Sequence, residues 1–418
     1  MPTDHFIRRS SVAAVLAGVL VASGCTGTTP SPVVGTAVAQ ARKSARPVAP
    51  QIVAADNAFG LALFNALNRS ATSNLAISPI SIALALQIVY NGAGGSTQQG
   101  MSQALQLQGL GALAVDKYNA ALQAALISPD PKAQLRIANS LWMHLRENPV
   151  LPSFVSTNET YYAAKIGDLG GAPDDVNAWV ASETNGLIKK ILPPKNYRKV
   201  VAILANAIYF REMWTSTFIP SLTRTAPFTL SDGTEISCQM MHKTSTFPYF
   251  SGSNFQAVEL PYGQTRRLRM LIILPAVGVN LKSFVANMTS GELSEWIADL
   301  EPAHAEIGLP RFTATYEGSL DNALTSLGMG AAFDANVADF TGLASRTRVY
   351  ISDIEHETVV KVDESGTVAA GATAAETVLQ SLPIGVIMNR PFFYAIVDGK
   401  TGALLFIGTL IDPIQSSS

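Results

Sequence analysis

The chain has 418 residues, of which 48% are hydrophobic and 14% charged, and its 29 basic and 31 acidic side chains give a formal net charge of −2. This near-neutral balance argues against a protein that binds nucleic acid through its phosphates, because such binding needs an excess of Lys and Arg. With only 2 cysteines, a chain of this length must draw its stability from a buried core.

The first 24 residues are typical of a secretory signal peptide. Arg8 and Arg9 precede a short apolar run over residues 12–22, which is too short to span a membrane as a mature helix. The following Ala22-Ser23-Gly24-Cys25 resembles a bacterial lipobox, in which small residues precede a cysteine that receives diacylglycerol. We therefore expect residues 1–24 to be removed and Cys25 to be lipidated. An unmodified Cys25 in a secreted protein is the alternative.

Residues 26–50 are rich in Thr, Pro, Ser and Ala and show neither helical nor strand periodicity. This composition predicts that residues 25–50 form a flexible tether with a reach of roughly 25–30 Å. A lipidated Cys25 would make the protein an exported, membrane-anchored component of the cell envelope, on its periplasmic or extracellular face. No second linker and no repeat follow, so residues 51–415 are expected to form a single domain.

Helical patterns dominate the first half of this domain. Residues 57–68 are amphipathic, residues 80–90 are apolar on nearly all sides, and residues 175–191 have helical spacing with a stop near Gly186. The second of these segments predicts a helix buried in the middle of the fold. Asp174 and Asp175 precede the third segment and are expected to cap its helix.

Strand patterns dominate the second half, at residues 200–210, 268–274, 305–312, 347–362 and 392–411, the last broken by a turn at Asp398-Gly399. Early helices and late strands without regular alternation predict an α+β fold. Cys238 is expected to be a small buried side chain. Arg266, Arg267 and Arg269 are expected to lie on a solvated hairpin face and not to bind a polyanion.

No catalytic or cofactor-binding motif is present. The sequence contains no H-E-x-x-H, C-x-x-C, G-x-S-x-G or phosphate-binding loop, and Gly109-Leu110-Gly111 follows no predicted strand. The sequence thus indicates that the protein is not an enzyme and needs no metal or cofactor.

The segment 364–381 reads ESGTVAAGATAAETVLQS. With the two-residue period of a strand, one face carries only small uncharged residues: Thr367, Ala369, Gly371, Thr373, Ala375 and Thr377. The opposite face carries the lone charge of this alternation, Glu376. Such a strand could be buried on one face without desolvating a charge. A flexible surface loop whose alternation arose by chance is the alternative interpretation.

Several sequence blocks occur in a defined order: NLAISPISI at 74–82, NAIYF at 206–210, VELPY at 258–262, LPRF at 309–312 and NRPF at 389–392. With these blocks the chain resembles the serpin family from about residue 53 to residue 413. Two positions depart from the family's pattern. Glu212 stands where glycine is usual, and Glu357 stands where lysine is usual.

The resemblance implies an α+β serpin fold, with helices around a large central mixed β-sheet, two further sheets and an exposed reactive loop at about 364–389. It also implies an irreversible, monomeric inhibitor of a serine or cysteine endopeptidase. Cleavage of the loop would form a covalent acyl-enzyme, and the loop would then insert into the central sheet. A non-inhibitory serpin acting as a carrier is the alternative. The residues implied for the hinge of the loop are Glu364, Gly366, Thr367, Ala369, Ala370, Gly371 and Ala372.

The same match implies further site residues. Counting forward from Glu364 and back from Pro391 places the scissile bond at Gln380-Ser381, with Leu379-Gln380 as the alternative. Insertion from Thr367 to Gln380 would carry that bond roughly 40–45 Å at ~3.3 Å per residue. Trp214 is implied to lie at the breach, the end of the sheet where insertion begins. The shutter, a buried polar cluster under the central sheet, is implied to consist of Ser78, Ser81, Asn206 and His356.

Overall fold

The computed structural model describes residues 47–127, 134–186, 188–345, 349–367 and 382–415. The expected signal peptide and all but the end of the tether lie outside these residues, as does segment 368–381. The helices are α2 (Pro50–Asn68), α3 (Pro79–Tyr90), α4 (Gly95–Ala104), α5 (Ala112–Leu126), α6 (Pro152–Tyr162), α7 (Asp174–Glu183), α8 (Leu281–Ala286), α9 (Ser290–Ala298), α10 (Asp321–Leu324) and α11 (Gly330–Phe333), with short turns η1 (Leu169–Gly171), η2 (Pro220–Leu222) and η3 (Thr325–Met329).

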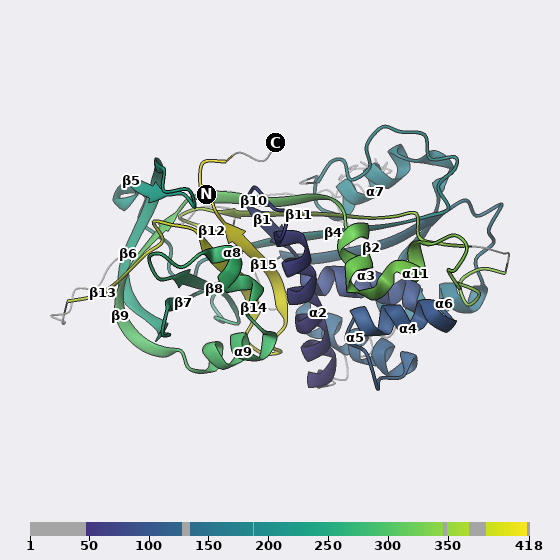
Figure 1. Ribbon diagram of the computed structural model, residues 1–418, viewed down its shortest axis with the longest axis horizontal. Coiled ribbons are helices and arrows are strands. Elements are labelled where there is room, and N and C mark those ends of the chain that lie inside the picture. The colour runs from purple at the N-terminus through teal and green to yellow at the C-terminus, as the bar shows by residue number, and fades with distance from the viewer. Residues whose placement is uncertain (1–46, 128–133, 187, 346–348, 368–381, 416–418) are drawn as a thin grey trace, which may run out of the picture. The chain divides into compact units, whose positions relative to one another are not determined.

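The strands are β1 (Leu75–Ile77), β2 (Gln134–Met143), β3 (Lys165–Asp168), β4 (Ala202–Met213), β5 (Arg224–Thr229), β6 (Glu235–Ser251), β7 (Phe255–Pro261), β8 (Leu268–Pro275), β9 (Glu301–Pro310), β10 (Phe312–Ser319), β11 (Asp353–Val362), β12 (Gly366–Thr367), β13 (Ile384–Ile387), β14 (Phe392–Asp398) and β15 (Leu404–Leu410). The helices fall mainly in the first half of the sequence and the strands in the second (Figure 1), which confirms the predicted α+β class.

A six-stranded mixed sheet carries the part of the fold that matters for function. Its order is β10-β11-β4-β2-β3, and β12 pairs with the end of β4. β10 and β2 run antiparallel to their neighbours β11 and β4, whereas β11 runs parallel to β4. The parallel ladder joins Asp353–Glu357 to residues 203–207. Beyond this ladder, β12 is the strand that lies beside β4.

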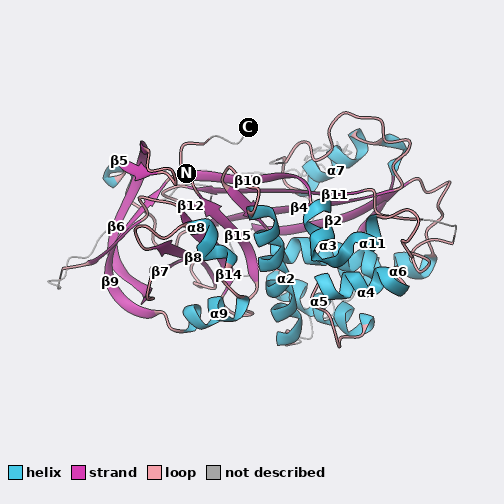
Figure 2. Ribbon diagram, in the orientation of Figure 1, coloured by secondary structure: helices cyan, strands magenta, loops and turns pink. Residues whose placement is uncertain are grey.

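The two faces of this sheet are covered differently (Figure 2). On the outer face, α7 places Val176 and Val180 against Trp142, Ile203 and Ala205 of the sheet. On the inner face, α3 contacts β2, β4 and also β15 of the other sheet. Every residue of α3 is buried, because the helix has a sheet or another helix on each side. The prediction of a central buried helix at 80–90 is thereby confirmed.

The remaining strands form one nine-stranded network, in the order β1-β15-β14-β8-β7-β6-β9-β13 with β5 beside β6. The 17-residue β6 joins its two parts. Residues 240–249 of this strand pair with β9, and residues 249–251 pair with β7. The two further sheets that were expected are therefore continuous with each other through one long strand.

Some of the predicted boundaries and surfaces were wrong. The helix expected to stop near Gly186 ends at Glu183, where the Thr184 hydroxyl donates to Val180 O at 2.8 Å and accepts from Ile188 N at 3.2 Å. Asp174 and Asp175 lie in the first turn of α7 and make no side-chain cap, although their charges still complement the helix dipole. The strand predicted at 305–312 is split at Arg311 into β9 and β10, which belong to different sheets.

The arginine cluster is only partly solvated. Arg267 forms a two-pronged ion pair with Asp398, whose side chain is fully buried. Arg269 pairs with buried Glu259 at 3.1 Å. Arg266 is exposed and the Arg269 side chain is still 39% exposed. The expected solvated face was therefore wrong for Arg267 alone, which the buried carboxylate of Asp398 draws inward. Cys238 is buried as predicted. In the described part of the chain, no helix combines the length and hydropathy needed to cross a membrane.

Candidate functional site

The chain reverses direction at the end of β11. The backbone N–H of Asp363 donates to Gly366 O at 3.0 Å, that of Gly366 donates to Asp363 O at 3.2 Å, and the Asp363 carboxylate accepts from Ser365 N at 2.9 Å. Gly366 has φ 140°, and a Cβ at this position would lie 2.4 Å from Glu212 O. Only glycine fits here, because any side chain would strain the backbone and collide with β4.

This turn delivers β12 to the side of β4. Gly366 pairs with Met213 and Thr367 with Glu212 in antiparallel register. Thr367 is 2% exposed, and its hydroxyl lies 3.1 Å from that of Tyr262, also buried. Thr367, the first residue of the predicted inserting strand, and Gly366 before it thus already occupy strand positions at the end of the six-stranded sheet.

Trp214, which follows β4, donates two hydrogen bonds to this turn. Its indole N–H donates to Asp363 O at 2.9 Å, and its backbone N–H donates to Ser365 O at the same distance. The indole stacks on Tyr262 with ring centroids 4.3 Å apart and planes 14° apart. The backbone N–H of Phe218 donates to Glu364 O at 2.9 Å. The segment that follows β4 therefore binds three main-chain carbonyls at the root of the loop, two through backbone N–H groups and one through the indole N–H.

Glu364 is fixed by its side chain as well. Arg311 donates from Nε to both carboxylate oxygens at 2.8 Å and from Nη2 to Oε1, and the Thr223 hydroxyl donates to Oε1. Desolvation raises the pKa of Glu364, but the hydrogen bonds from Arg311 and Thr223 outweigh it and leave the pKa below its ordinary value. An ionised Glu364 thus anchors the turn that leads into the loop from within it.

A buried polar cluster lies under the middle of the same sheet. The Asn206 amide donates to Ser81 O at 2.9 Å, to Ser81 Oγ at 2.6 Å and to Asn139 Oδ1. The Asn206 carbonyl oxygen lies 2.7 Å from His356 Nδ1. Ser78 meets this cluster only through Ser81: its Oγ accepts from Ser81 N at 3.4 Å, which caps α3, and donates to Leu405 O at 2.7 Å. The structure brings Ser81, Asn206 and His356 together as expected, and places Ser78 one helical turn away.

The hydrogen bonds determine the state of His356. The carbonyl oxygen of Asn206 can only accept, so His356 Nδ1 carries the proton. Nε2 is then the acceptor for the Thr358 hydroxyl. Complete burial lowers the pKa of His356 to about 3, so the ring is neutral. The cluster links α3 to the strands β2, β4 and β11 without a buried charge.

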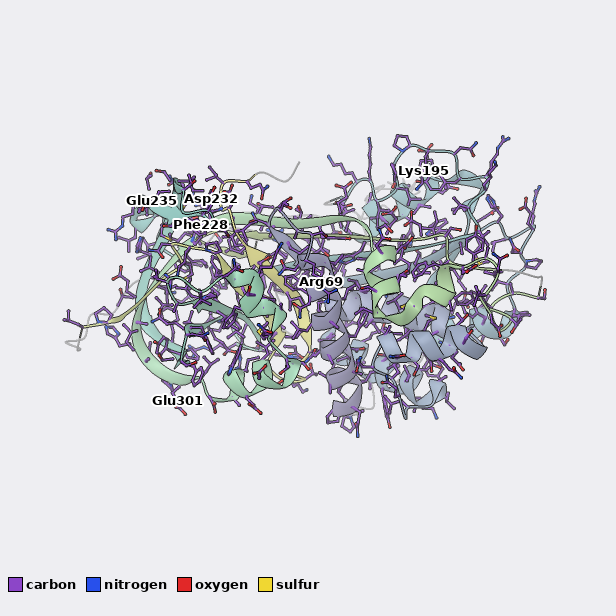
Figure 3. The ribbon with its side chains drawn as sticks, in the orientation of Figure 1. Arg69, Lys195, Phe228, Asp232, Glu235 and Glu301 are labelled. Atoms are coloured by element: carbon purple, nitrogen blue, oxygen red, sulfur yellow. The ribbon has the colours of Figure 1, made fainter. Side chains whose placement is uncertain are left out.

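A group of carboxylates occupies the outer face of β11. Asp353, Glu355 and Glu357 alternate along this strand, and Glu357 lies directly opposite Glu317 of β10. Lys195, labelled in Figure 3, lies 3.5 Å from Asp353. Burial, followed by the charge of Asp353, raises the pKa of Glu355 to about 8. Burial, followed by the charge of Glu317, raises the pKa of Glu357 to about 7. The neighbouring like charges oppose ionisation of these β11 carboxylates.

Several site residues were not found from the sequence. Tyr262 and Arg311 lie in sequence blocks that carry the family resemblance, and membership of those blocks could have marked both as site residues. Asn139, Thr358, Thr223 and Phe218 gave none, since only tertiary contact brings them to the site. The predicted Ala369, Ala370, Gly371 and Ala372, both candidate scissile bonds and Cys25 lie outside the described residues.

Comparison with known proteins places this geometry in a family. Residues 54–413 match the family model described as serpin, serine protease inhibitor. An uncharacterised serpin-like protein of Thermococcus kodakarensis is 32% identical over 374 residues, covering 87% of this chain and 86% of that relative. The leukocyte elastase inhibitor of Equus caballus is 31% identical over 386 residues, covering 87% of this chain and 100% of that relative.

Solved structures agree with the sequence relatives. The native state of the thermophilic serpin tengpin superposes with a TM-score of 0.81 at 28% identity, covering 88% of this chain and 95% of that one. Human thyroxine-binding globulin superposes with a TM-score of 0.79 at 24% identity, covering 87% of this chain and 99% of that one. The second likeness is one of fold alone.

Proposed function

The chain belongs to the serpin family, and on that premise we propose that it is an irreversible suicide-substrate inhibitor of serine endopeptidases, with cysteine endopeptidases as a second target class. The observation that carries the proposal is the placement of Thr367, which is buried beside β4 with its hydroxyl at Tyr262. A loop whose first residues already lie in strand position can continue as a strand once its far end is released.

The chemistry follows that of an ordinary substrate up to the acyl-enzyme. The protease serine attacks the carbonyl carbon of Gln380, the bond to Ser381 breaks, and the amino group of Ser381 leaves with a proton. An ester now joins the Gln380 carbonyl to the protease. Insertion of residues 368–380 as a new strand would then carry that ester to the far end of the sheet and pull the protease active site out of shape before water can hydrolyse it.

The described part of the sheet is suited to such an insertion. The direct β4–β11 ladder joins five residue pairs, Asp353↔Ile203 to Glu357↔Ala207, and antiparallel pairing with an inserted strand would replace its hydrogen bonds. Continued from Thr367↔Glu212, the register turns the small residues Ala369, Gly371 and Thr373 to the inner face. Steric and desolvation costs of insertion are therefore low.

An electrophoretic experiment tests the proposal. We expect incubation with serine and cysteine endopeptidases to yield a covalent complex that survives SDS with at least one of them. A protease whose nucleophile is replaced by Ala should form none. Cleaved protein should also melt at a higher temperature than intact protein. Loop cleavage by every protease without complex or stabilisation would instead support a non-inhibitory carrier.

We also propose that the inhibitor is exported and lipid-anchored through Cys25, on the periplasmic or extracellular face of the envelope. The support is the sequence Ala22-Ser23-Gly24-Cys25 after an apolar run, followed by a tether-like segment. Metabolic labelling with a radioactive fatty acid should mark the wild type and spare Cys25→Ser. Equal labelling of both would remove the anchor, while leaving the inhibitory proposal intact.

A further inference from the structure

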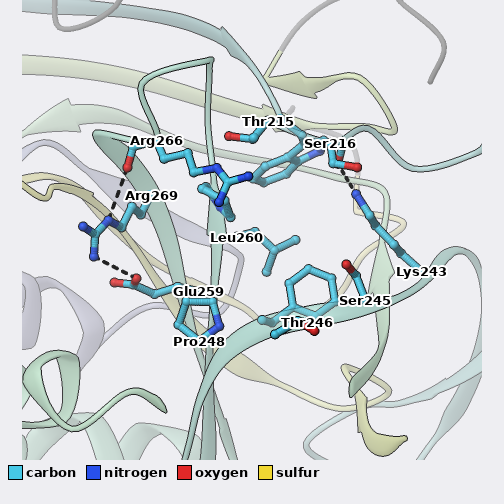
Figure 4. Close-up of a pocket in the computed structure, with 13 residues that line it drawn as sticks. Thr215, Ser216, Lys243, Ser245, Thr246, Pro248, Glu259, Leu260, Arg266 and Arg269 are labelled. Atoms are coloured by element: carbon cyan, nitrogen blue, oxygen red, sulfur yellow. Dashed lines mark hydrogen bonds and ion pairs between the residues drawn. The ribbon is translucent and has the colours of Figure 1, made fainter. Parts of the chain in front are cut away.

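A cavity of about 340 Å³ lies next to Trp214 (Figure 4). It is lined by residues 214–216, which follow β4, by β6 and β7, by the turn before β8 and by Arg269 of β8. Trp214, Phe247 and Leu260 supply apolar walls. Its volume is at the lower end of the ~300–1,000 Å³ range of small-molecule sites, and it belongs neither to the loop nor to the polar cluster described above.

Two cationic side chains lie at opposite sides of this cavity (Figure 4). Arg266 is exposed with φ 56°, and within the described part of the chain its guanidinium enters no hydrogen bond or ion pair. Lys243 donates to the carbonyls of Ser216 and Thr217, which leaves one ammonium proton for another partner. Burial lowers the pKa of Lys243 to about 8, so it is still mainly charged at neutral pH.

Glu259 lines one wall of the cavity, with its carboxylate turned toward Arg269 (Figure 4). The residue is 1% exposed, and its Oε2 accepts from Arg269 at 3.1 Å. Its Oε1 is buried and accepts no hydrogen bond from the residues that the structure describes. A buried acceptor without a donor destabilises the folded protein. Because the charge of Arg269 already offsets that of Glu259, Glu259 Oε1 would be satisfied by a neutral hydrogen-bond donor and does not require a second cation.

We propose that this cavity binds a small aromatic anion that also carries an N–H or O–H donor. The anionic group would lie at Arg266, the aromatic body would fill the space beside Trp214 and Leu260, and the donor would reach Glu259 Oε1. Lys243 would add positive charge from the opposite side. The surplus of positive charge at the rim selects an anion, and the apolar walls select an aromatic body over an inorganic ion. This site is independent of whether the loop inhibits a protease.

Three dyes of one scaffold test the assignment. The probe 8-anilinonaphthalene-1-sulfonate has two aromatic systems, a sulfonate and one N–H. N-phenyl-1-naphthylamine lacks the sulfonate, and 8-(N-methylanilino)naphthalene-1-sulfonate lacks the N–H. In isothermal titration of the folded protein we expect one saturable site for the first dye. Affinities for the other two should be at least tenfold weaker.

Variants locate the site. Arg266→Gln should weaken binding of 8-anilinonaphthalene-1-sulfonate about tenfold or more, whereas Arg266→Lys should keep most of the affinity. Arg198→Gln, which removes another exposed arginine outside the cavity, is the matched control and should bind as the wild type does. Unchanged melting temperatures would show that each variant is folded.

Two results would overturn the proposal. If Arg266→Gln bound the dye within twofold of the wild type, the anion would not be held in this cavity. If the sulfonate-free dye bound as tightly as the parent dye, the cavity would be a general apolar surface. Equal binding of the N-methyl dye would remove the role given to Glu259, which is part of the proposed ligand class.

Discussion

The hydroxyls of Thr367 and Tyr262 lie 3.1 Å apart, both buried under the end of the six-stranded sheet. Tyr262 in turn stacks on Trp214, whose indole N–H bonds Asp363 O. The first hinge residue therefore occupies a buried, hydrogen-bonded position that accepts only a small side chain, and the buried Glu212 lies opposite Thr367 in the strand register.

Thr367→Arg tests this seat. A guanidinium cannot be buried at a position that is 2% exposed without a large desolvation cost, so we expect the loop to be cleaved as a plain substrate. Covalent complex on an SDS gel should fall at least tenfold, and the cleaved variant should gain little thermal stability. Thr367→Ser, which keeps the hydroxyl, should inhibit nearly as the wild type does. Full inhibition by Thr367→Arg would refute burial of this face.

Glu376 is predicted to set a pH dependence of inhibition. Extension of the Thr367↔Glu212 register would place Glu376 opposite Ile203, which pairs with Asp353 before insertion. Glu376 would then approach the carboxylates of β11, where Glu355 has a pKa of about 8. Glu376→Gln should lower the number of inhibitor molecules used per protease inhibited at pH 8.5, and less so at pH 6. Glu376→Asp keeps the charge and should behave as the wild type; equal behaviour of all three would contradict the register.

The pair formed by Arg311 and Glu364 should stabilise the root of the loop. Arg311→Gln removes a two-pronged charged contact from a carboxylate that is mostly buried. Because Arg311 is half exposed, we expect a loss of only about 1 kcal/mol in the free energy of unfolding. The exchanged pair Arg311→Glu with Glu364→Arg should recover part of it. Strict additivity of the two single substitutions in a double-mutant cycle would show that the contact contributes nothing.

Glu357 should weaken the fold as pH rises. Its pKa is raised to about 7 in the folded protein from an ordinary 4.5, so between these values the folded state binds more proton than the unfolded state. The free energy of unfolding then falls with rising pH. The wild type should melt at a lower temperature at pH 8 than at pH 5.5, and Glu357→Gln should lose less over the same interval. An unchanged difference in the variant would show that this carboxylate is not the cause.

His356 should act in the opposite direction. Its pKa is lowered to about 3 from an ordinary 6.5, so the unfolded state takes up a proton that the folded state refuses. This contribution is present above pH 6.5 and is lost as pH falls toward 3. His356→Gln should be less stable than the wild type at pH 7, because the bonds to Asn206 and Thr358 are disturbed. Between pH 6.5 and 4.5 the free energy of unfolding of His356→Gln should fall less than that of the wild type. An equal fall in both proteins would show that another group titrates.

Local pattern was sufficient for much of the fold. The apolar character of residues 80–90 predicted α3, and the turn at Asp398-Gly399 predicted the β14–β15 hairpin. Gly186 predicted the end of α7 to within three residues, and the Thr184 hydroxyl, which bonds Val180 O, accounts for the earlier end at Glu183. The split of the predicted strand at Arg311 could not be predicted, because a chain that passes from one sheet to another keeps its strand periodicity.

The sequence by itself determined the period of small residues from Thr367 onward, the glycine at 366 and the blocks that identify the family, since these depend on neighbours along the chain. The tertiary structure alone decided which groups are buried together. It placed Tyr262 over Thr367, Arg311 on Glu364 and Asn139 on Asn206, and it set Arg267 and Arg269 on buried acids. Burial and charge partners depend on contacts between distant segments, and so do the protonation states of His356, Glu355 and Glu357.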